Sequence, residues 1–488
     1  MTTGNRPSVL IIGAGFGGIG MAIELRRNGF HDLTILERAA DLGGVWRENT
    51  YPGAACDVPS PLYSFSFEPK PDWPQRYSGR AAIHAYLRGV AERNGVLDAI
   101  QFGTDVTDAE FDDASGRWTV RTADGTARTV DVLISAVGQL SRPALPNLPG
   151  IDTFAGPAFH SAEWDHGIEL TGKRVACIGT GASAIQYIPE IQPKVAHLTL
   201  FQRTPAWVIP KFDTDYSPIQ HKLFARLPGA LLAERLGWWA IADFVSLGLV
   251  EFPAIARLVA RIADRHLRKQ VTDPQLRAVL TPDYPIGCKR ALFSNDYYPA
   301  LTQPNVRVET AAIAEVVPEG VRTADGTVHP VDVIIYGTGF KGTEFLWPMD
   351  IYGRAGHKLS DAWTDGAHAY YGIAVPEFPN LFLVYGPNTN LSAGSIIYMI
   401  ESQTRYIRQA VELLERRPGH TLEVRTDLEQ RFNTALQQRL DRTPWNFCSS
   451  WYRNAAGRIT NNWPGSQTSY RRRIRKLDPD DYTLTASA

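Results

Sequence analysis

The stretch "SVLIIGAGFGGIGMAIELRRNG" (residues 8–29) decides the fold of the chain. A short apolar strand runs into Gly13-x-Gly15-x-x-Gly18, and a helical pattern of apolar residues follows. Glycines at these places allow a tight turn and let the backbone approach a pyrophosphate, while the helix N-terminus offers N–H donors and the positive end of its dipole. The stretch therefore predicts a Rossmann-like unit that binds a dinucleotide.

The next segment strengthens this prediction. A second strand, "LTILERA" (33–39), ends at Glu37, which lies 24 residues after Gly13. A carboxylate at this distance accepts hydrogen bonds from the hydroxyls of a ribose. The residues that we expect to contact this first cofactor are Gly13, Gly15, Phe16, Gly18, Glu37 and Arg38.

A second copy of the motif follows in "KRVACIGTGASAIQ" (173–186). The next strand, "HLTLFQRTP" (197–205), brings Arg203 to a position 24 residues after Gly179. A guanidinium favours a 2′-phosphate, whereas a carboxylate favours a free 2′-hydroxyl, so the first site is predicted to hold FAD and the second NADPH. A plain surface arginine is the alternative interpretation of Arg203. The expected contacts in the second turn are Gly179, Thr180, Gly181, Ala182 and Ser183.

An internal repeat supports the duplication. "RTADGTARTVDVLISAVG" (121–138) matches "RTADGTVHPVDVIIYGTG" (322–339) at a constant offset of 201 residues. Each copy predicts a strand, an Asp-Gly turn and a second strand that leads to a glycine. We expect each copy to close one nucleotide-binding unit, and the chain to cross between domains just after it.

These patterns predict an α/β fold with two Rossmann-like dinucleotide-binding domains and a helical insertion. The length of 488 residues agrees with more than one core. We expect a discontinuous FAD-binding domain at 1–144 and 331–488, and an NADPH-binding domain at 145–330. The insertion is predicted at about 212–280, where the sequence has apolar and basic periodicity but no nucleotide signal.

The composition limits the kinds of binding partner and the compartment that we expect for the chain. A formal net charge of -1 favours neither nucleic acid nor an anionic membrane. Four cysteines (Cys56, Cys177, Cys288 and Cys448) lie far apart, without C-x-x-C or metal-ligand spacing. This favours a reducing compartment, here the cytoplasm, and no metal site. The apolar run at residues 9–12 is too short for the core of a signal peptide.

One apolar segment tests this expectation. "LGWWAIADFVSLGLV" (236–250) is interrupted by Asp243 and falls short of the ~20 apolar residues of a membrane-spanning helix. A buried core helix is the favoured interpretation. A helix that touches a membrane surface, or that shapes a hydrophobic substrate entrance, is the alternative.

A family resemblance rests on several separate motifs. "FAGPAFHSAEWDH" (154–166) resembles the F-x-G-x-x-x-H-x-x-x-W-[PD] fingerprint of type I Baeyer–Villiger monooxygenases. Related flavin-containing monooxygenases usually lack its Trp-[Pro/Asp] ending. "GGVWRENTYPGAACD" (43–57) matches a second motif of the family, and "FQRTP", "YPIGCKR" and "GPNTNLSAGSIIYMIESQ" resemble it too, so the likeness covers nearly the whole chain. The chain lacks the closely spaced redox cysteine pair of flavin disulfide reductases.

The resemblance implies an FAD- and NADPH-dependent monooxygenase. Such enzymes use O2 to convert ketones to esters or lactones through a peroxyflavin. A fixed guanidinium beside the peroxide is required, and the resemblance assigns it to Arg290, held by Asp57. It also brings the loop 43–57 and Tyr63 to the flavin, and adds Thr204 and Lys289 to Arg203 on the 2′-phosphate. The implied flavin contacts are Gly44, Val45, Trp46, Asp57 and Tyr63.

Several alternatives stay open at this point. Oxygenation of a soft sulfur or nitrogen atom is the second function, and a flavin-binding scaffold or sensor without turnover is the third. His160 is expected either to couple cofactor binding to domain movement or to be structural. The partners are a small ketone and O2, with membrane-surface contact a minor alternative. Aromatic residues near the C-terminus either line an apolar pocket or pack in a core: Trp445, Trp451, Tyr452 and Trp463.

Overall fold

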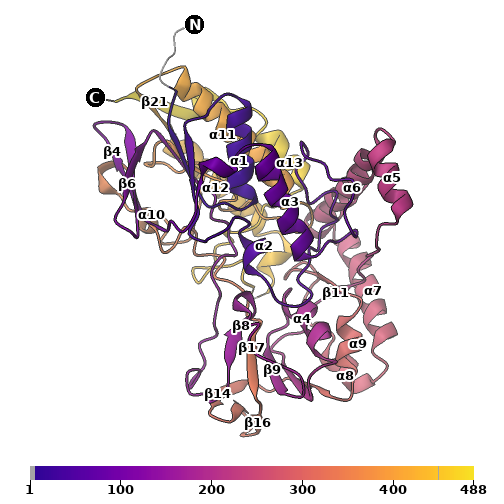
Figure 1. The fold of residues 1–488 in the computed structure, drawn as a ribbon. Coiled ribbons are helices and arrows are strands. Elements are labelled where there is room, and N and C mark those ends of the chain that lie inside the picture. Colours follow the sequence, from indigo (N-terminus) through magenta and orange to yellow (C-terminus); the bar gives the residue numbers. More distant parts are fainter. Residues whose placement is uncertain (1–5, 449, 488) are drawn as a thin grey trace.

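A computed structural model describes residues 6–448 and 450–487 of the chain. Figure 1 shows two lobes: the upper one contains the N-terminal and C-terminal segments, and the lower one contains strands from the middle of the sequence. Each lobe is built on a five-stranded sheet. The two dinucleotide-binding domains of the predicted α/β fold are therefore present.

The first sheet has the order β19-β7-β1-β2-β3, and all of its strands are parallel. β1 and β7 are buried along their whole length because helices cover one face of the sheet and the antiparallel strands at residues 106–130 cover the other. α1 and α11 pack against each other on this sheet. The bounds are β1 (Val9–Ile12), β2 (Leu33–Leu36), β3 (Ile100–Gln101), β7 (Val132–Ser135), β19 (Leu381–Leu383), α1 (Phe16–Arg27) and α11 (Ile396–Glu415).

The second sheet has the order β13-β10-β9-β17-β8, again with parallel strands. β17 pairs with β9, so this sheet continues beyond residue 330, where the sequence placed the end of the NADPH-binding domain. The other domain limits stay a prediction. The bounds are β8 (Ala158–His160), β9 (Arg174–Ile178), β10 (His197–Phe201), β13 (Val306–Glu309), β17 (Val333–Tyr336), α4 (Ala184–Ile191) and α9 (Tyr297–Leu301).

Strand register corrects one comparison between the two units. Ile12 pairs with Leu36 in the first sheet, whereas Ile178 pairs with Phe201 in the second. The connection in the second unit is thus one residue shorter, and Gln202 is the counterpart of Glu37. Arg203 corresponds to Arg38. The equal spacing of 24 residues in the sequence therefore does not place Arg203 where Glu37 lies.

The predicted repeat forms two hairpins of the same construction. In each one, a threonine hydroxyl donates to the aspartate of the Asp-Gly turn, from Thr122 to Asp124 at 2.6 Å and from Thr323 to Asp325 at 2.7 Å. Both hairpins lead into a central strand, as expected. The bounds are β4 (Val106–Asp112), β5 (Arg117–Thr122), β6 (Ala127–Val130), β14 (Ile313–Val317), β15 (Gly320–Thr323), β16 (Val328–Pro330) and β18 (Asp350–Tyr352), which joins β4.

The chain crosses between the lobes just after each hairpin, and the two crossing segments pair with each other. Ala144 donates its backbone N–H to Gly339 O at 2.9 Å, and Lys341 donates its own to Arg142 O at 3.0 Å. An antiparallel bridge joins Pro143 to Phe340. The entry to the second unit and the exit from it therefore lie side by side.

Helices occupy the predicted insertion at 212–280. They are α5 (Pro218–Arg226), α6 (Ala230–Glu251), α7 (Pro253–Gln270) and α8 (Pro274–Val279), and Figure 1 shows them on one flank. The expected buried core helix at 236–250 is wrong, since only Ser246, Gly248 and Leu249 of α6 are buried. In the described part of the chain no single helix is long and apolar enough to cross a membrane; α6 and α7 meet that test only together, bent by 109°.

A disulfide joins Cys288 to Cys448 across 160 residues of sequence, while Cys56 and Cys177 are buried free thiols. Scattered spacing gave no reason to expect this bond, because the pairing of distant cysteines cannot be deduced from sequence. The cysteine argument for a reducing compartment therefore loses its ground, and the cytoplasmic location stays a prediction.

The remaining helices and strands complete the two lobes. They are α2 (Val45–Glu48), α3 (Arg80–Arg93), α10 (Leu359–Ala362), α12 (Thr426–Leu440), α13 (Gln467–Arg473), β11 (Val208–Ile209), β12 (Leu292–Phe293), β20 (His420–Val424) and β21 (Tyr482–Ala486). β20 and β21 pair antiparallel near the C-terminus, and β11 pairs with β12 beside the helical insertion.

Candidate active site

A cavity of about 1410 Å³ receives residues from both nucleotide-binding units. The glycine-rich turns, the loop 43–57, the crossing segments and the insertion helices all contribute to its wall. Almost every predicted site residue lines it: Gly13, Gly15, Phe16, Glu37, Arg38, Gly44, Val45, Trp46, Asp57, Tyr63, Gly179, Thr180, Gly181, Ala182, Ser183, Arg203, Thr204, Lys289 and Arg290. Gly18 is the exception.

The glycines of the first glycine-rich turn have two roles: some allow close packing, and one leaves the backbone open toward the cavity. A Cβ on Gly18 would lie 1.9 Å from Gly13 O, so this glycine lets the helix pack on the turn rather than face the cavity. Gly13 has φ +100°, and a Cβ there would lie 2.8 Å from Ala136 O. A Cβ on Gly15 would meet only Gly44 Cα, at 3.8 Å. The turn therefore leaves open backbone where a pyrophosphate would bind.

Glu37 is anchored beneath this turn. Its Oε2 accepts from the backbone N–H of Ala14 at 2.8 Å, and its Oε1 accepts from that of Ala39 at 3.0 Å. Arg47 reaches Oε1 at 3.4 Å. The carboxylate is buried yet lines the cavity, and it has acceptor capacity left for a ribose hydroxyl.

The second turn presents positive charge instead. Arg203 is exposed, and the described residues supply it with no ion-pair partner. Burial, and then the nearby Arg203, lower the pKa of Lys289. Thr180 Oγ1 donates to the carbonyl of Thr204 at 2.9 Å, which fixes the strand end beside the turn. Two cations without a fixed carboxylate suit a phosphate group.

The loop 43–57 links the two units. Gly53 has φ +75°, and a Cβ there would lie 2.7 Å from Gln186 O on α4. The Gln186 amide receives a hydrogen bond from Tyr51 OH at 2.9 Å and donates to Ala55 O at 3.0 Å. Trp46 donates its Nε1–H to Tyr63 OH at 3.1 Å on the cavity wall. The loop thus carries an aromatic pair and ends at Asp57, beside the second unit.

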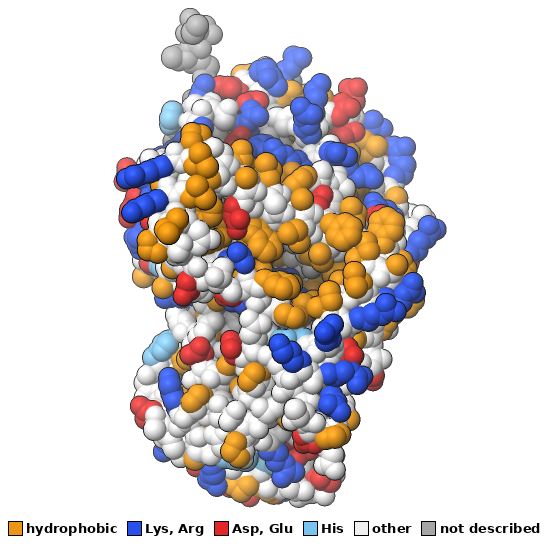
Figure 2. All heavy atoms as spheres, turned by 90° about the vertical axis from the view of Figure 1, so that its right-hand side faces the viewer, with side chains coloured by type: hydrophobic (Ala, Val, Ile, Leu, Met, Phe, Trp, Pro, Cys, Tyr) orange, Lys and Arg blue, Asp and Glu red, His pale blue; other side chains and the backbone are white. Residues whose placement is uncertain are grey.

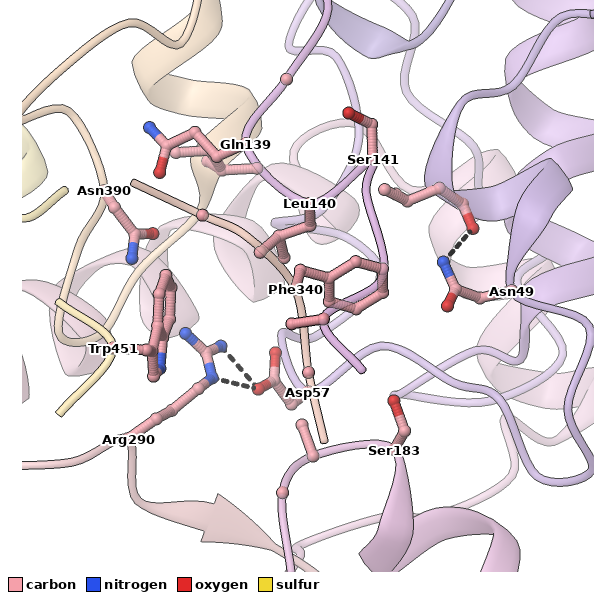
Figure 3. Close-up of a pocket in the computed structure, with 18 of the residues that line it drawn as sticks. Asn49, Asp57, Gln139, Leu140, Ser141, Ser183, Arg290, Phe340, Asn390 and Trp451 are labelled. Carbon is pink, nitrogen blue, oxygen red and sulfur yellow. Dashed lines mark hydrogen bonds and ion pairs between the residues drawn. The ribbon is translucent and has the colours of Figure 1, made fainter. Parts of the chain in front are cut away.

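Arg290 and Asp57 form an ion pair across the cavity. The Nε and NH2 groups of Arg290 both donate to Asp57 Oδ2, at 3.0 and 2.6 Å (Figure 3). Asp57 raises the pKa of Arg290 further, against the opposing effect of burial. One-third of the arginine side chain is still exposed (33%), so it is fixed but can contact a ligand.

The C-terminal aromatic residues divide between wall and core. Trp451 is 40% exposed and lines the cavity, where Figure 3 places it beside Arg290. Trp445, Tyr452 and Trp463 are buried in the core. The pocket interpretation therefore holds for one of the four residues and the packing interpretation for three.

The cavity wall also contains residues that were not singled out from the sequence, among them Gln139, Phe340, Tyr385 and Asn390. Gln139 and Phe340 directly follow the two repeats, after Gly138 and Gly339, so the repeat itself marked their positions. Tyr385 donates its hydroxyl to Asn390 Oδ1 at 3.1 Å and has φ +61°. Such strained backbone is frequent at functional sites, but nothing in the local sequence signals it.

His160 lies outside the cavity. It is buried at the end of β8, and its Nδ1 accepts from the backbone N–H of Ala162 at 3.1 Å. Its ring packs edge-on against Phe340, with the centroids 5.8 Å apart. Burial lowers the pKa of His160. The residue thus contacts the crossing segment rather than the space where a substrate would bind.

Comparison with known sequences identifies the family of the chain. The model of the family described as flavin-binding monooxygenase-like matches residues 6–350. A curated protein of Streptomyces coelicolor named Baeyer-Villiger monooxygenase is 45% identical over 483 residues, which is 98% of this chain and 93% of the relative.

Solved structures extend the likeness to the whole fold. Cyclohexanone monooxygenase from Rhodococcus sp. Phi1 bound to NADP+ superposes with a TM-score of 0.87 at 28% identity, covering 98% of this chain and 99% of that one. A monooxygenase named OTEMO, in complex with FAD and NADP, reaches 0.88 at 27% identity over the same shares. The chain belongs to the flavin-binding monooxygenase-like family, on the branch of the Baeyer–Villiger monooxygenases.

Proposed function

We propose that this chain is a Baeyer–Villiger monooxygenase that uses FAD, NADPH and O2 to convert ketones to esters or lactones. The observation that carries the proposal is the Arg290–Asp57 pair, which faces a cavity shared by two nucleotide-binding turns. Two nucleotide sites beside one fixed cation suit a reaction in which a reductant, a flavin and an oxyanion meet.

The residues of the first turn fit FAD. Open backbone at Gly15 and the anchored carboxylate of Glu37 would take its pyrophosphate and ribose, and Trp46 and Tyr63 line the wall farther in. When bound and reduced, a flavin is the group that reacts with O2. Arg203, Thr204 and Lys289 would hold the 2′-phosphate of NADPH at the other turn.

Arg290 is the proposed catalytic residue. Its guanidinium stays protonated at any working pH, and Asp57 raises its pKa further. A charge held in one place stabilises negative charge on oxygen as that charge develops, without reorganisation at the moment of reaction. Asp57 has a positioning role, because both donors of Arg290 that it holds converge on a single oxygen.

Product analysis tests the proposal. Purified protein with FAD and NADPH should convert members of a panel of cyclic, linear and aromatic ketones to esters or lactones. Oxidation of a thioether alone, with every ketone untouched, would favour the heteroatom oxygenase instead. If NADPH failed to bleach the visible absorbance of the flavin, the chain would be a binding scaffold and the proposal would be wrong.

A further inference from the structure

The exposed surface of α6 is apolar, unlike that of an ordinary surface helix. Leu232, Leu236, Ile241 and Phe244 are 51–59% exposed, whereas the exposed charged residue of this helix, Glu251, is its last residue. The other charged residues of the helix, Glu234, Arg235 and Asp243, are half-buried. Arg235, for example, donates to the carbonyls of Pro61 and Ser64 at 2.6 and 3.0 Å. A helix that faces water normally shows the reverse arrangement.

The exposed apolar surface continues on both neighbouring helices. We call the outer surface of α5, α6 and α7, with residue 212, the mouth face. Figure 2 shows its apolar side chains gathered around a hollow. Its exposed large apolar residues are Phe212, Ile219, Leu223, Leu227, Leu232, Leu236, Ile241, Phe244, Phe252, Leu258 and Ile262. Contiguous apolar patches of this kind mark interaction sites.

The mouth face surrounds the entrance of the candidate active site. Phe212, Ile241 and Ile262 are exposed and also line the cavity that contains Arg290. Whatever covers the mouth face therefore controls the medium from which a substrate enters.

Positive charge flanks the apolar residues, as Figure 2 shows. The acidic side chains on these helices are already engaged: Glu251 pairs with Arg439 at 2.8 Å and Asp264 with Arg268 at 2.7 Å. Glu234 accepts from Trp238 at 2.9 Å, and Asp243 accepts from the Thr468 N–H at 3.3 Å. Six exposed cations have no ion pair within residues 6–448 and 450–487: Lys222, Arg226, Arg257, Arg261, Arg265 and Lys269.

We propose that the mouth face docks on the surface of an anionic lipid bilayer. Apolar side chains bordered by Lys and Arg are what an interfacial helix needs, since the first enter the acyl boundary and the second meet lipid phosphates. A second copy of this chain would bring two sets of unpaired cations together, so it fits less well. The net charge of -1 for the whole chain conceals this local concentration.

Docking would place the cavity entrance in the lipid phase. A lipophilic ketone could then pass from the bilayer to Arg290 without crossing water. This consequence rests on the proposed function, whereas docking itself does not require turnover.

Vesicle flotation of the FAD-loaded protein tests the docking. We expect the protein to float with vesicles in which about a third of the lipid is phosphatidylglycerol and to bind pure phosphatidylcholine vesicles less. High salt should weaken the binding. No NADPH or ketone is present, so a failure of the proposed function would leave this result unchanged.

Paired variants identify the surface. Leu236→Ser/Phe244→Ser and Arg257→Glu/Arg261→Glu should each weaken partitioning at least about tenfold. None of these four residues lines the cavity. The matched controls are Phe102→Ser/Phe447→Ser and Arg416→Glu/Arg417→Glu, which change exposed residues outside the mouth face and should bind as the unmodified protein does. Flavin absorbance and the melting temperature confirm that each variant is folded.

Three results would overturn the docking proposal. One is the absence of any flotation with the anionic vesicles. Another is an equal loss of binding in the control variants. The third is a dimer in light scattering that Leu236→Ser/Phe244→Ser converts to a monomer, because a second copy would then be what covers the mouth face.

Discussion

The two glycine-rich turns share a strand–turn–helix plan but differ in where they place their charged residue. Glu37, at the first turn, is buried and bound by two backbone N–H groups. At the second turn the corresponding residue is the buried amide Gln202, and the charge moves one residue on, to the exposed Arg203. We propose that the first arrangement helps to hold FAD through a buried carboxylate, and that the second offers a surface cation to the 2′-phosphate of NADPH.

The largest effect should come from the residue pair that joins the two units. Arg290→Ala removes the fixed positive charge and should lower ester formation at least several hundredfold, since one such donor is worth about 3–4 kcal/mol. NADPH oxidation should persist and yield hydrogen peroxide. Product and peroxide assays measure both. Arg322→Ala, which breaks a surface pair with Glu315, is the control. Near-normal ketone oxidation by Arg290→Ala would show that the wrong residue has been named.

Breaking the first turn should cost the protein its flavin. Glu37→Ala leaves the N–H groups of Ala14 and Ala39 without their acceptor, at about 1–3 kcal/mol each when buried. FAD affinity should fall about a hundredfold, which flavin release during dialysis would reveal. Glu110→Ala, which breaks an exposed pair with Arg121 outside the cavity, should retain FAD. A yellow, stable Glu37→Ala protein would contradict the anchoring role.

Breaking the second turn should affect only the choice of nicotinamide. Arg203→Ala should raise KM for NADPH on the order of ten- to hundredfold and leave KM for NADH unchanged, because only the 2′-phosphate loses a partner. Arg38, its structural counterpart, pairs with Glu48 at 3.1 Å, so Arg38→Ala should not alter this ratio. Equal use of both nicotinamides by the unmodified protein would remove the basis of the assignment.

His160 should have a smaller effect, through the crossing segment. His160→Ala removes its bond to Ala162 and its packing on Phe340, and should slow oxygenation about two- to tenfold with FAD still bound. Steady-state rates measure the slower oxygenation, and the flavin content shows whether FAD is still bound. A variant with full rate and full coupling of NADPH to product would make His160 purely structural.

The smallest effect should be a pH dependence at the second turn. The pKa of Lys289 is lowered, so its positive charge is lost as pH rises through a value below that of a free lysine. Affinity for NADPH should therefore be full at neutral pH and fall a few-fold under alkaline conditions. Lys289→Arg should abolish this dependence, since a guanidinium does not titrate there. A KM that stays flat in the unmodified protein would exclude a contact with the phosphate.

The sequence predicted the architecture well because glycine spacing and the repeated hairpin are local signals. It also placed Arg290 and Asp57 in one site through the family resemblance, although they lie far apart in the chain. The sequence did not reveal that Gln202, rather than Arg203, is the counterpart of Glu37. A one-residue difference in the length of a connection changes the strand register without changing the motif.

Two other misses have tertiary causes. α6 has the composition of a core helix, but most of its residues are not buried, and the contacts of Arg235 show that this charged residue faces inward. The disulfide between Cys288 and Cys448 depends on the C-terminal stretch returning to the Arg290 segment, which no local pattern encodes.

The paired crossing segments have a consequence for protein engineering. Because Ala144 and Lys341 each donate a backbone hydrogen bond to the opposite crossing segment, the second unit has its two ends next to each other. When the two ends of an inserted domain lie together, the domain that receives it has almost no loop to close. Domain insertion is tolerated in this situation. The unit between these crossings is thus a natural cassette, and chimeras of related chains should be cut at residues 143 and 340.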